Sequence, residues 1–412
     1  MDALPFIREN LRFLIVGTLL TFNSSFGQTF FISIFAAQIM AVFSLTNGQW
    51  GLLYTVGTTA SAVVMFWAGA LTDHFRARVL ACFIMPGLAL TCVAMAVNGS
   101  IIGLFLIVFF LRFLGQGMIF QLATVSMARW FAARRGLALS LSATGFWIGQ
   151  AAIPVVFASL MVHLDWRYLW FLSAGIVLLS FPAVLWLLAQ ERTPQSLAQD
   201  TQSTGIGGRH WTRKEVITSK LFWLLVPILL GPPAWGTALF FQQVHIASVK
   251  GWPLVEYLAL IPVMTAISVG VTLITGELID RFGSGRLLQI FPLSWVGGFL
   301  VLALADTLGV ALMAFIIFGV ATGMQASLFT AFWAEYFGTR YLGAIKATSA
   351  SIMVLGSAIG PAVSGVLIDL GYPFPKQMFA FSAFFIAAMV FVWFAVESAN
   401  RALAAQIDVE RA

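Results

Sequence analysis

Twelve stretches of about 20 mostly apolar residues follow one another along this chain. An α-helix rises 1.5 Å per residue, so about 20 residues cross the roughly 30 Å hydrocarbon layer of a bilayer. A backbone in lipid must also satisfy its own hydrogen bonds, which helices do. The sequence therefore predicts an all-α membrane protein with transmembrane helices at residues 11–40, 48–71, 79–97, 101–128, 137–161, 168–190, 221–247, 254–278, 287–305, 308–334, 343–368 and 377–396.

The distribution of charge agrees with this topology. Charged residues make up 9% of the chain, whereas a soluble domain has about 25%, so lipid must face much of the surface. Of the 22 Lys and Arg residues, eighteen fall on one side of the predicted helices, and Arg167, Lys250 and Lys376 fall on the other. The positive-inside rule then places both termini on the cytoplasmic side of the membrane, which we expect to be the inner, or plasma, membrane. Because the basic residues lie in short loops, the net charge of +6 does not indicate a nucleic-acid partner.

A polar segment divides the chain into two halves. Residues 191–220 are rich in Ser, Thr, Gly and Gln and predict a flexible cytoplasmic linker. The predicted domains are an N-terminal six-helix bundle (1–190), this linker, and a C-terminal six-helix bundle with a short tail (221–412).

A short motif after the second apolar run recurs after the eighth. Gly69–Arg78 and Gly276–Arg286 share Gly, Leu, Asp and Phe at an offset of 207 residues, which indicates two related bundles. Glycine allows helices to approach closely, and an aspartate can accept hydrogen bonds from the first amides of a helix and from arginine. We therefore predict gating loops, with topological anchoring by charge as the alternative. Their residues are Gly69, Asp73, Arg78, Arg134, Gly276, Asp280, Arg281, Arg286, Glu335 and Arg340, of which Glu335 and Arg340 are expected to form an ion pair.

These two loops resemble the signature motif of the major facilitator superfamily, Gly-x-Leu-x-Asp-Arg-x-Gly-Arg-Arg. The second copy fits closely, with one additional residue between Gly283 and Arg286, whereas the first has His74 and Arg76 at two motif positions. The resemblance implies two pseudo-symmetric six-helix bundles, and a transporter that is not an enzyme and needs no cofactor. A monomer is expected.

Three further segments resemble the monocarboxylate and oxalate/formate branch of that superfamily: Arg129–Ala138, Glu335–Gly343 and Phe240–His245. Members of the mammalian type have a lysine on helix one and an Asp/Arg pair on helix eight. This chain has neither, so their proton-coupling residues are not carried over.

Arg112 is the only Lys or Arg near the centre of a predicted helix. An isolated charge there costs at least ~2.5–3.5 kcal/mol on insertion scales, so it should face a wet cavity or a partner. All sixteen Asp and Glu residues fall in loops or near predicted helix ends. We therefore expect Arg112 to receive a carboxylate or another anion, ideally in a bidentate pair. The alternative is a structural arginine that caps carbonyls or glutamines inside the N-terminal bundle.

Neutral polar and aromatic residues at a similar depth are expected to line the same cavity. Gln116 lies one turn from Arg112, and any single glutamine could instead bridge two helices. The segment Gly231–Gly236 contains two prolines and predicts a bend or break in the seventh helix, either for packing or as part of the site. The predicted solute-binding residues are Arg112, Gln116, Gln28, Asn23, Trp147, Gln150, Trp235, Gln242, Gln243 and Gln325.

Together these features predict a secondary transporter that moves a small, monocarboxylate-like organic anion by alternating access, with H⁺ as the coupling ion. The sequence contains no nucleotide-binding motif, so transport driven by ATP is not indicated. The two cysteines indicate neither a disulfide nor a metal site. One alternative is a drug or metabolite exporter of the same superfamily. Another is a nutrient receptor that does not transport.

Overall fold

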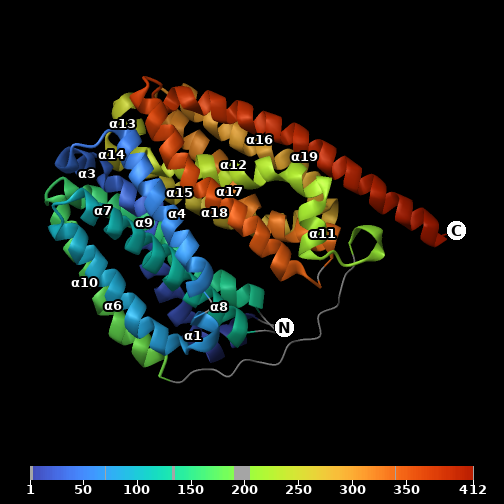
Figure 1. Cartoon of the computed structure of the whole chain (residues 1–412), viewed down its shortest axis with the longest axis horizontal. Coiled ribbons are helices and arrows are strands. Elements are labelled where there is room, and N and C mark those ends of the chain that lie inside the picture. Colours follow the sequence, from blue (N-terminus) through green and yellow to red (C-terminus); the bar gives the residue numbers. More distant parts are fainter. Residues whose placement is uncertain (1–2, 70, 132–134, 190–204, 339, 412) are drawn as a thin grey trace. The chain divides into compact units, whose positions relative to one another are not determined.

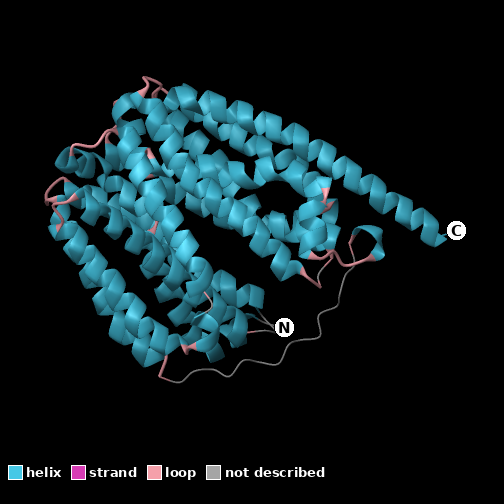
Figure 2. Ribbon diagram, in the orientation of Figure 1, coloured by secondary structure: helices cyan, strands magenta, loops and turns pink. Residues whose placement is uncertain are grey.

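Every regular element in the described part of the chain is a helix (Figures 1 and 2). The computed structural model describes residues 3–69, 71–131, 135–189, 205–338 and 340–411. Within these ranges ten helices are long and apolar enough to cross a membrane, or eleven if one bent pair counts as a single span. The predicted second crossing corresponds to α4 (Asn47–Ala68), a 22-residue helix outside that set of ten. The predicted all-α membrane class is confirmed.

The chain folds as two compact units, Met1–Asp200 and Thr201–Ala412. Polar residues at helix starts fix several boundaries in the first unit, as when the Ser100 hydroxyl accepts from the backbone N–H of Gly103. The elements of this unit are α1 (Ala3–Ser24), η1 (Ser25–Gly27), α2 (Thr29–Ile32), η2 (Ser33–Phe35), α3 (Ala36–Phe43), α4, α5 (Leu71–His74), α6 (Ala77–Val97), α7 (Ile101–Phe110), η3 (Leu111–Ile119), α8 (Phe120–Trp130), α9 (Arg135–Met161) and α10 (Trp166–Leu187).

The first predicted helix, at residues 11–40, is broken in the structure. Its two parts, Phe6–Gly27 and Thr29–Phe43, meet at an angle of 48°. The helix ends because serine hydroxyls compete for helical carbonyls, as Ser24 does at the carbonyl of Thr21 (2.7 Å), and because glycine disfavours a helix. Gln28 then takes an extended conformation (φ −87°, ψ 153°). The prediction of one continuous helix is therefore wrong here.

The second unit contains a similar set of long helices. Its elements are η5 (Ile206–Gly208), α11 (Arg213–Thr218), α12 (Lys220–Phe241), α13 (Gln243–Lys250), α14 (Leu254–Leu258), α15 (Leu260–Phe282), α16 (Ser284–Leu304), α17 (Leu308–Phe337), α18 (Leu342–Asp369) and α19 (Phe374–Arg411). The short tail predicted after residue 396 is instead a continuation of α19, which runs to the C-terminal end in Figure 1.

The seventh predicted helix departs from the prediction in a different way. The helix α12 continues through Gly231–Gly236, and the chain leaves helical geometry only at Gln242 (φ −94°, ψ 14°). Aromatic rings pack closely there, and a Cβ at Gly231 would lie 2.6 Å from the ring of Phe384. We infer that packing of α12 against α19 supports the helix across its prolines.

Part of the predicted flexible linker is ordered on the second unit. The backbone N–H of Trp211 donates to the carbonyl of Phe337 (3.0 Å), and the two rings lie 5.4 Å apart. A capping box between Thr212 and Glu215 starts α11. The flexible-linker prediction is thus wrong for residues 205–218, and residues 190–204 lie outside the described part.

Glycines bring matching helix pairs together in both units. The helix α1 packs on α9 in the first unit, and α12 packs on α18 in the second. A Cβ at Gly145 of α9 would lie 1.9 Å from the Thr18 carbonyl oxygen of α1, and one at Gly360 of α18 would lie 2.0 Å from the Ala234 carbonyl oxygen of α12. These contacts need glycine, as expected for small residues at a membrane helix interface.

Candidate solute-binding site

Arg112 lies in a π-helical segment, η3, within the long span from Ile101 to Trp130. Such segments carry i→i+5 hydrogen bonds and occur frequently at functional sites. The side chain of Arg112 is 2% exposed. The arginine therefore points into the first unit and does not face lipid.

Two glycines set the position of Arg112 relative to the broken first helix. A Cβ at Gly27 would lie 2.2 Å from the carbonyl oxygen of Leu111, and a Cβ at Gly115 would lie 2.7 Å from the Cα of Gly27. The two backbones therefore touch directly where the helix breaks. This contact brings the carbonyl of Gly27 within reach of Arg112.

The guanidinium makes two hydrogen bonds, both from Nη1. One goes to the carbonyl oxygen of Gly27 (3.1 Å) and the other to the hydroxyl of Thr29 (3.3 Å). The hydroxyl of Tyr54 donates to the same Thr29 oxygen (2.8 Å), and the Tyr54 ring centroid lies 5.4 Å from the Arg112 Cζ. A cation over an aromatic face is attracted by the ring quadrupole. The break, α4 and η3 together position Arg112.

The other edge of the guanidinium is left without hydrogen bonds. An arginine has five N–H donors, and the Nε donor of Arg112 is buried without a partner. Ion pairs among the described side chains join Arg209 to Glu215 and Arg401 to Glu397, and neither involves Arg112. Within the described residues, no carboxylate neutralises this buried cation. The bond to the Gly27 carbonyl is also what the alternative, a structural arginine that caps a carbonyl, predicts.

Sequence analysis did not identify Thr29 and Tyr54 as site residues. Thr29 immediately follows Gln28, which was predicted, so its proximity to the site had a sequence signal. Tyr54 had none, because polar residues such as Thr55 and Thr58 follow it on more than one face of the helix and do not show which face points inward.

The remaining predicted residues of the first unit have differing environments. Asn23 is fully buried, donates to the carbonyl of Leu19 (2.7 Å) and accepts from the Ser180 hydroxyl (3.1 Å), so it bridges α1 and α10. Gln28 is buried at the break itself, beside Thr29. Gln116 in η3 and Trp147 in α9 are half-buried. Gln150 in α9 is buried, and its side-chain carbonyl has no hydrogen-bond partner.

Four predicted residues belong to the second unit. Gln242 donates to the hydroxyl of Ser364 (3.1 Å) and so links α12 to α18. Trp235 stacks on Phe381 at 4.3 Å with its indole N–H buried and unpartnered. Gln243 in α13 is buried, and Gln325 in α17 is half-buried. These four residues and Arg112 belong to different units of the chain.

The second gating loop has a different partner from the one predicted. Glu335 accepts from the backbone N–H of Ser284 (3.0 Å) and from its hydroxyl, and thereby caps the start of α16. Arg340 lies over the ring of Tyr341 (5.5 Å), and no ion pair joins it to Glu335. The predicted Glu335–Arg340 pair is therefore wrong. Glu335 is drawn to Ser284 by the sharp turn at Gly283 (φ 80°).

The other gating residues are exposed or lie outside the description. Asp280, Arg281 and Arg286 are exposed around that turn, and a Cβ at Gly276 would meet no atom within 4 Å. In the first loop, Gly69 ends α4 and Arg78 is exposed at the start of α6. The side chain of Asp73 and all of Arg134 are outside the described part. Their gating role stays a prediction.

A cavity of about 700 Å³ lies between α6 and α7, and Arg112 is not one of its lining residues. Its lining is mostly apolar and includes Leu90 and Phe110, which are 69% and 43% exposed. The lining contains no charged side chain that could bind an anion, so this cavity is not the candidate solute site.

Comparison with known proteins gives a family and a fold. The family model described as the Major Facilitator Superfamily matches residues 17–351. A bacterial homologue of the human lysosomal transporter Spinster, in an inward-facing and unoccupied conformation, is similar with a TM-score of 0.71, 16% identity, and coverage of 96% of this chain and 97% of that chain. The nucleoside transporter NupG is similar with a TM-score of 0.72, 14% identity, and coverage of 94% and 98%. Comparison with curated protein sequences gives no significant match.

These structural neighbours are not members of the monocarboxylate branch, and at such identities they show the fold alone. The family model, in contrast, spans most of the chain, including both motif loops and the Arg112 segment. Its match agrees with the two helical units and with the apolar spans. The chain belongs to the major facilitator superfamily and is a multi-pass membrane transporter, not an enzyme.

Proposed function

We propose that this transporter moves a small organic anion, of the monocarboxylate type, across the inner membrane by alternating access. Arg112 receives the carboxylate of the solute, and the gating loops bias the two units toward one opening or the other. The resemblance of three segments to the monocarboxylate branch supports H⁺ as the coupling ion. Both termini are cytoplasmic, and the protein acts as a monomer.

One observation carries this proposal: the Nε edge of Arg112 is buried and unpartnered. Nε and Nη2 form the side-on edge of a guanidinium, which matches the two oxygens of a carboxylate. Both existing hydrogen bonds use Nη1, so they hold the group from the opposite side. A carboxylate bound at the Nε edge would leave the bonds from Nη1 to Gly27 and Thr29 in place.

The chemistry of the site also disfavours a cationic cargo. The described residues around Arg112 contribute a carbonyl, a threonine hydroxyl and a tyrosine ring, but no carboxylate. A cationic drug would meet an unscreened guanidinium at low dielectric, where like charges repel strongly. Drug efflux is accordingly the weaker alternative. A resistance assay with cationic dyes checks it.

The test is uptake into proteoliposomes by the wild type, Arg112→Lys and Arg112→Ala. The panel contains labelled mono- and dicarboxylates and a labelled nucleoside, because one structural neighbour is a nucleoside transporter. A hydrogen bond to a charged group contributes about 1.5–3 kcal/mol, so Arg112→Lys should lower carboxylate uptake at least tenfold and Arg112→Ala should abolish it. Arg167→Lys is the matched control, because Arg167 bonds the carbonyls of Ala96 and Asn98 at the end of α6.

Three results would oppose the proposal. Carboxylate uptake that stays at the wild-type rate in both Arg112 variants rules out the assigned role. Uptake of the nucleoside but of no carboxylate gives the transporter a neutral solute. An equal loss of uptake in the Arg167→Lys control shows that the effect is not specific to Arg112.

A further inference from the structure

A second groove, of about 550 Å³, lies in the second unit between the start of α12 and the far part of α19. It is separate from every residue assigned to solute binding or gating. Its lining residues are Lys220, Leu221, Leu224, Phe391, Phe394, Glu397, Ser398 and Arg401.

The groove has a charged end and an apolar end. On α19, Phe391, Phe394 and Arg401 follow one another at helical spacing and share a face. At 1.5 Å per residue, Arg401 lies about 15 Å along the axis from Phe391. On α12, Lys220 is the first residue, and Leu224 lies about 6 Å further in. The cations thus lie at one end and the phenyl rings at the other.

The apolar end is not covered by protein in the described structure. Phe391 is 44% exposed and Phe394 is 63% exposed, although both belong to a membrane-spanning helix. Trp223, beside the groove, is 60% exposed and its indole N–H donates to the carbonyl of Ile217. Exposed tryptophans concentrate where membrane meets water. The groove therefore crosses from the headgroup level into the hydrocarbon layer.

The charged end carries two cations and one carboxylate. Arg401 uses Nε to bond the Glu397 carboxylate at 3.2 Å, and the two side chains are 78% and 46% exposed. This bond leaves the Nη groups of Arg401 available, and Lys220 contributes a second ammonium charge. The proposed topology places this end on the cytoplasmic side, where basic pockets between helices bind anionic headgroups.

We propose that this groove binds an anionic phospholipid of the bilayer. The phosphate lies between Lys220 and Arg401, and an acyl chain lies along Leu224, Phe391 and Phe394. A zwitterionic lipid satisfies the apolar end equally but brings no net charge to the two cations, so the site selects for anionic headgroups. The inference depends on the proposed topology and not on the proposed solute.

The experiment measures lipid retention by the full-length protein. Protein in detergent is incubated with equal amounts of phosphatidylglycerol and phosphatidylcholine and separated by gel filtration, and the retained lipids are quantified by mass spectrometry. We expect wild-type protein to retain phosphatidylglycerol preferentially. In the double variant Lys220→Gln/Arg401→Gln, the excess of retained phosphatidylglycerol over phosphatidylcholine should be at least fivefold smaller than in the wild type.

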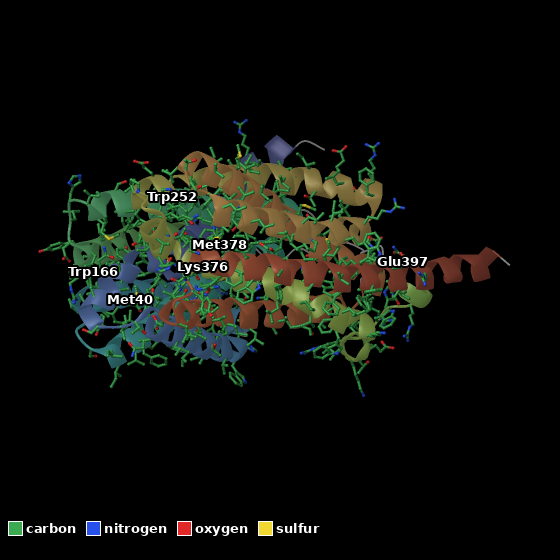
Figure 3. The ribbon with its side chains drawn as sticks, turned by 90° about the horizontal axis from the view of Figure 1, so that it is seen from above. Met40, Trp166, Trp252, Lys376, Met378 and Glu397 are labelled. Atoms are coloured by element: carbon green, nitrogen blue, oxygen red, sulfur yellow. The ribbon has the colours of Figure 1, made fainter. Side chains whose placement is uncertain are left out.

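The control is Lys376→Gln, because Lys376 is exposed on the same helix and lies well apart from Glu397 in Figure 3. It should leave retention unchanged. Glu397→Gln removes the only acid of the lining and should raise retention of phosphatidylglycerol. Ser398→Trp fills the groove without changing charge and should lower retention of both lipids.

Several outcomes overturn the assignment. Equal retention of the two lipids by wild-type protein excludes selectivity. A loss in Lys376→Gln as large as in the double variant indicates general surface charge. A fall with Glu397→Gln, or no change with Ser398→Trp, excludes the groove as the site. Gel-filtration profiles identify any variant that misfolds, and transport activity is not used as a readout.

Discussion

The contact between the broken first helix and the π-helical segment makes a specific stability prediction. Gly27→Ala places a Cβ 2.2 Å from the carbonyl oxygen of Leu111 and near the Cα of Gly115. Both neighbours are backbone atoms, so no side chain can rotate away. An ordinary carbon–oxygen contact is about 3.4 Å, so the two backbones must separate by roughly 1 Å.

The magnitude follows from two contributions. Overpacking of a tight interior contact costs about 1–3 kcal/mol. Separation also weakens the bond from Arg112 to the Gly27 carbonyl, and a hydrogen bond to a charged group contributes about 1.5–3 kcal/mol. A loss of about 3 kcal/mol in a unit of about 200 residues corresponds to a fall in Tm of roughly 6–12 °C.

Thermal unfolding in detergent, followed by intrinsic tryptophan fluorescence, measures this change. The matched control is Gly270→Ala in α15, where a Cβ would meet no atom within 4 Å. Alanine is favoured over glycine in a helix by about 1 kcal/mol, so the control should keep or raise its Tm. If Gly27→Ala unfolds at the temperature of Gly270→Ala, the backbone contact does not hold Arg112 in place.

Two other predictions concern the second unit. Glu335→Ala removes the cap of α16 at Ser284 and should lower Tm by roughly 2–4 °C, since a cap contributes about 1 kcal/mol, whereas exposed Glu277→Ala should not. Hydrogen bonds from Thr212, first from its backbone N–H, hold the pKa of the Glu215 carboxyl below its ordinary value of about 4.3. The stabilisation by this cap is therefore complete above that pH and is lost as the pH falls through the lower pKa of the folded protein, which hydrogen exchange of the α11 amides will detect; Glu215→Gln should remove this pH dependence.

The all-α membrane class was predictable because the lengths of the apolar runs are enough to indicate membrane-spanning helices. Local breaks were less predictable. Pro232 and Pro233 predicted a bend or break, but α12 is continuous through them. In the first helix, Ser24, Ser25 and Gly27 contained a signal for the break that is present. In the linker, the polar composition predicted flexibility, whereas the spacing of Thr212 and Glu215 is that of a capping box and indicates the start of a helix.

The candidate site shows a different limit. Arg112 was identified because its charge is unusual at that depth, and one residue in an apolar run is enough for that inference. Its partners were not identifiable in the same way. Tyr54 contacts Arg112 only in the folded chain, because the two residues lie far apart in the sequence. The Gly27 carbonyl is a backbone group, which has no sequence signature. The π-helical geometry of η3 likewise has no marker besides its glycines.

The two roles considered for Arg112 use different edges of one guanidinium. Nη1 holds Gly27 and Thr29 together across the helix break, which is a structural role. A neutral donor would bridge a carbonyl and a hydroxyl without the cost of burying a charge, which amounts to several kcal/mol. Structure alone therefore does not explain the charge, whereas a carboxylate at the unpartnered Nε edge does. In the proposed function, the bonds from Nη1 to Gly27 and Thr29 orient the Nε edge toward the solute, which couples solute binding to the break in the first helix.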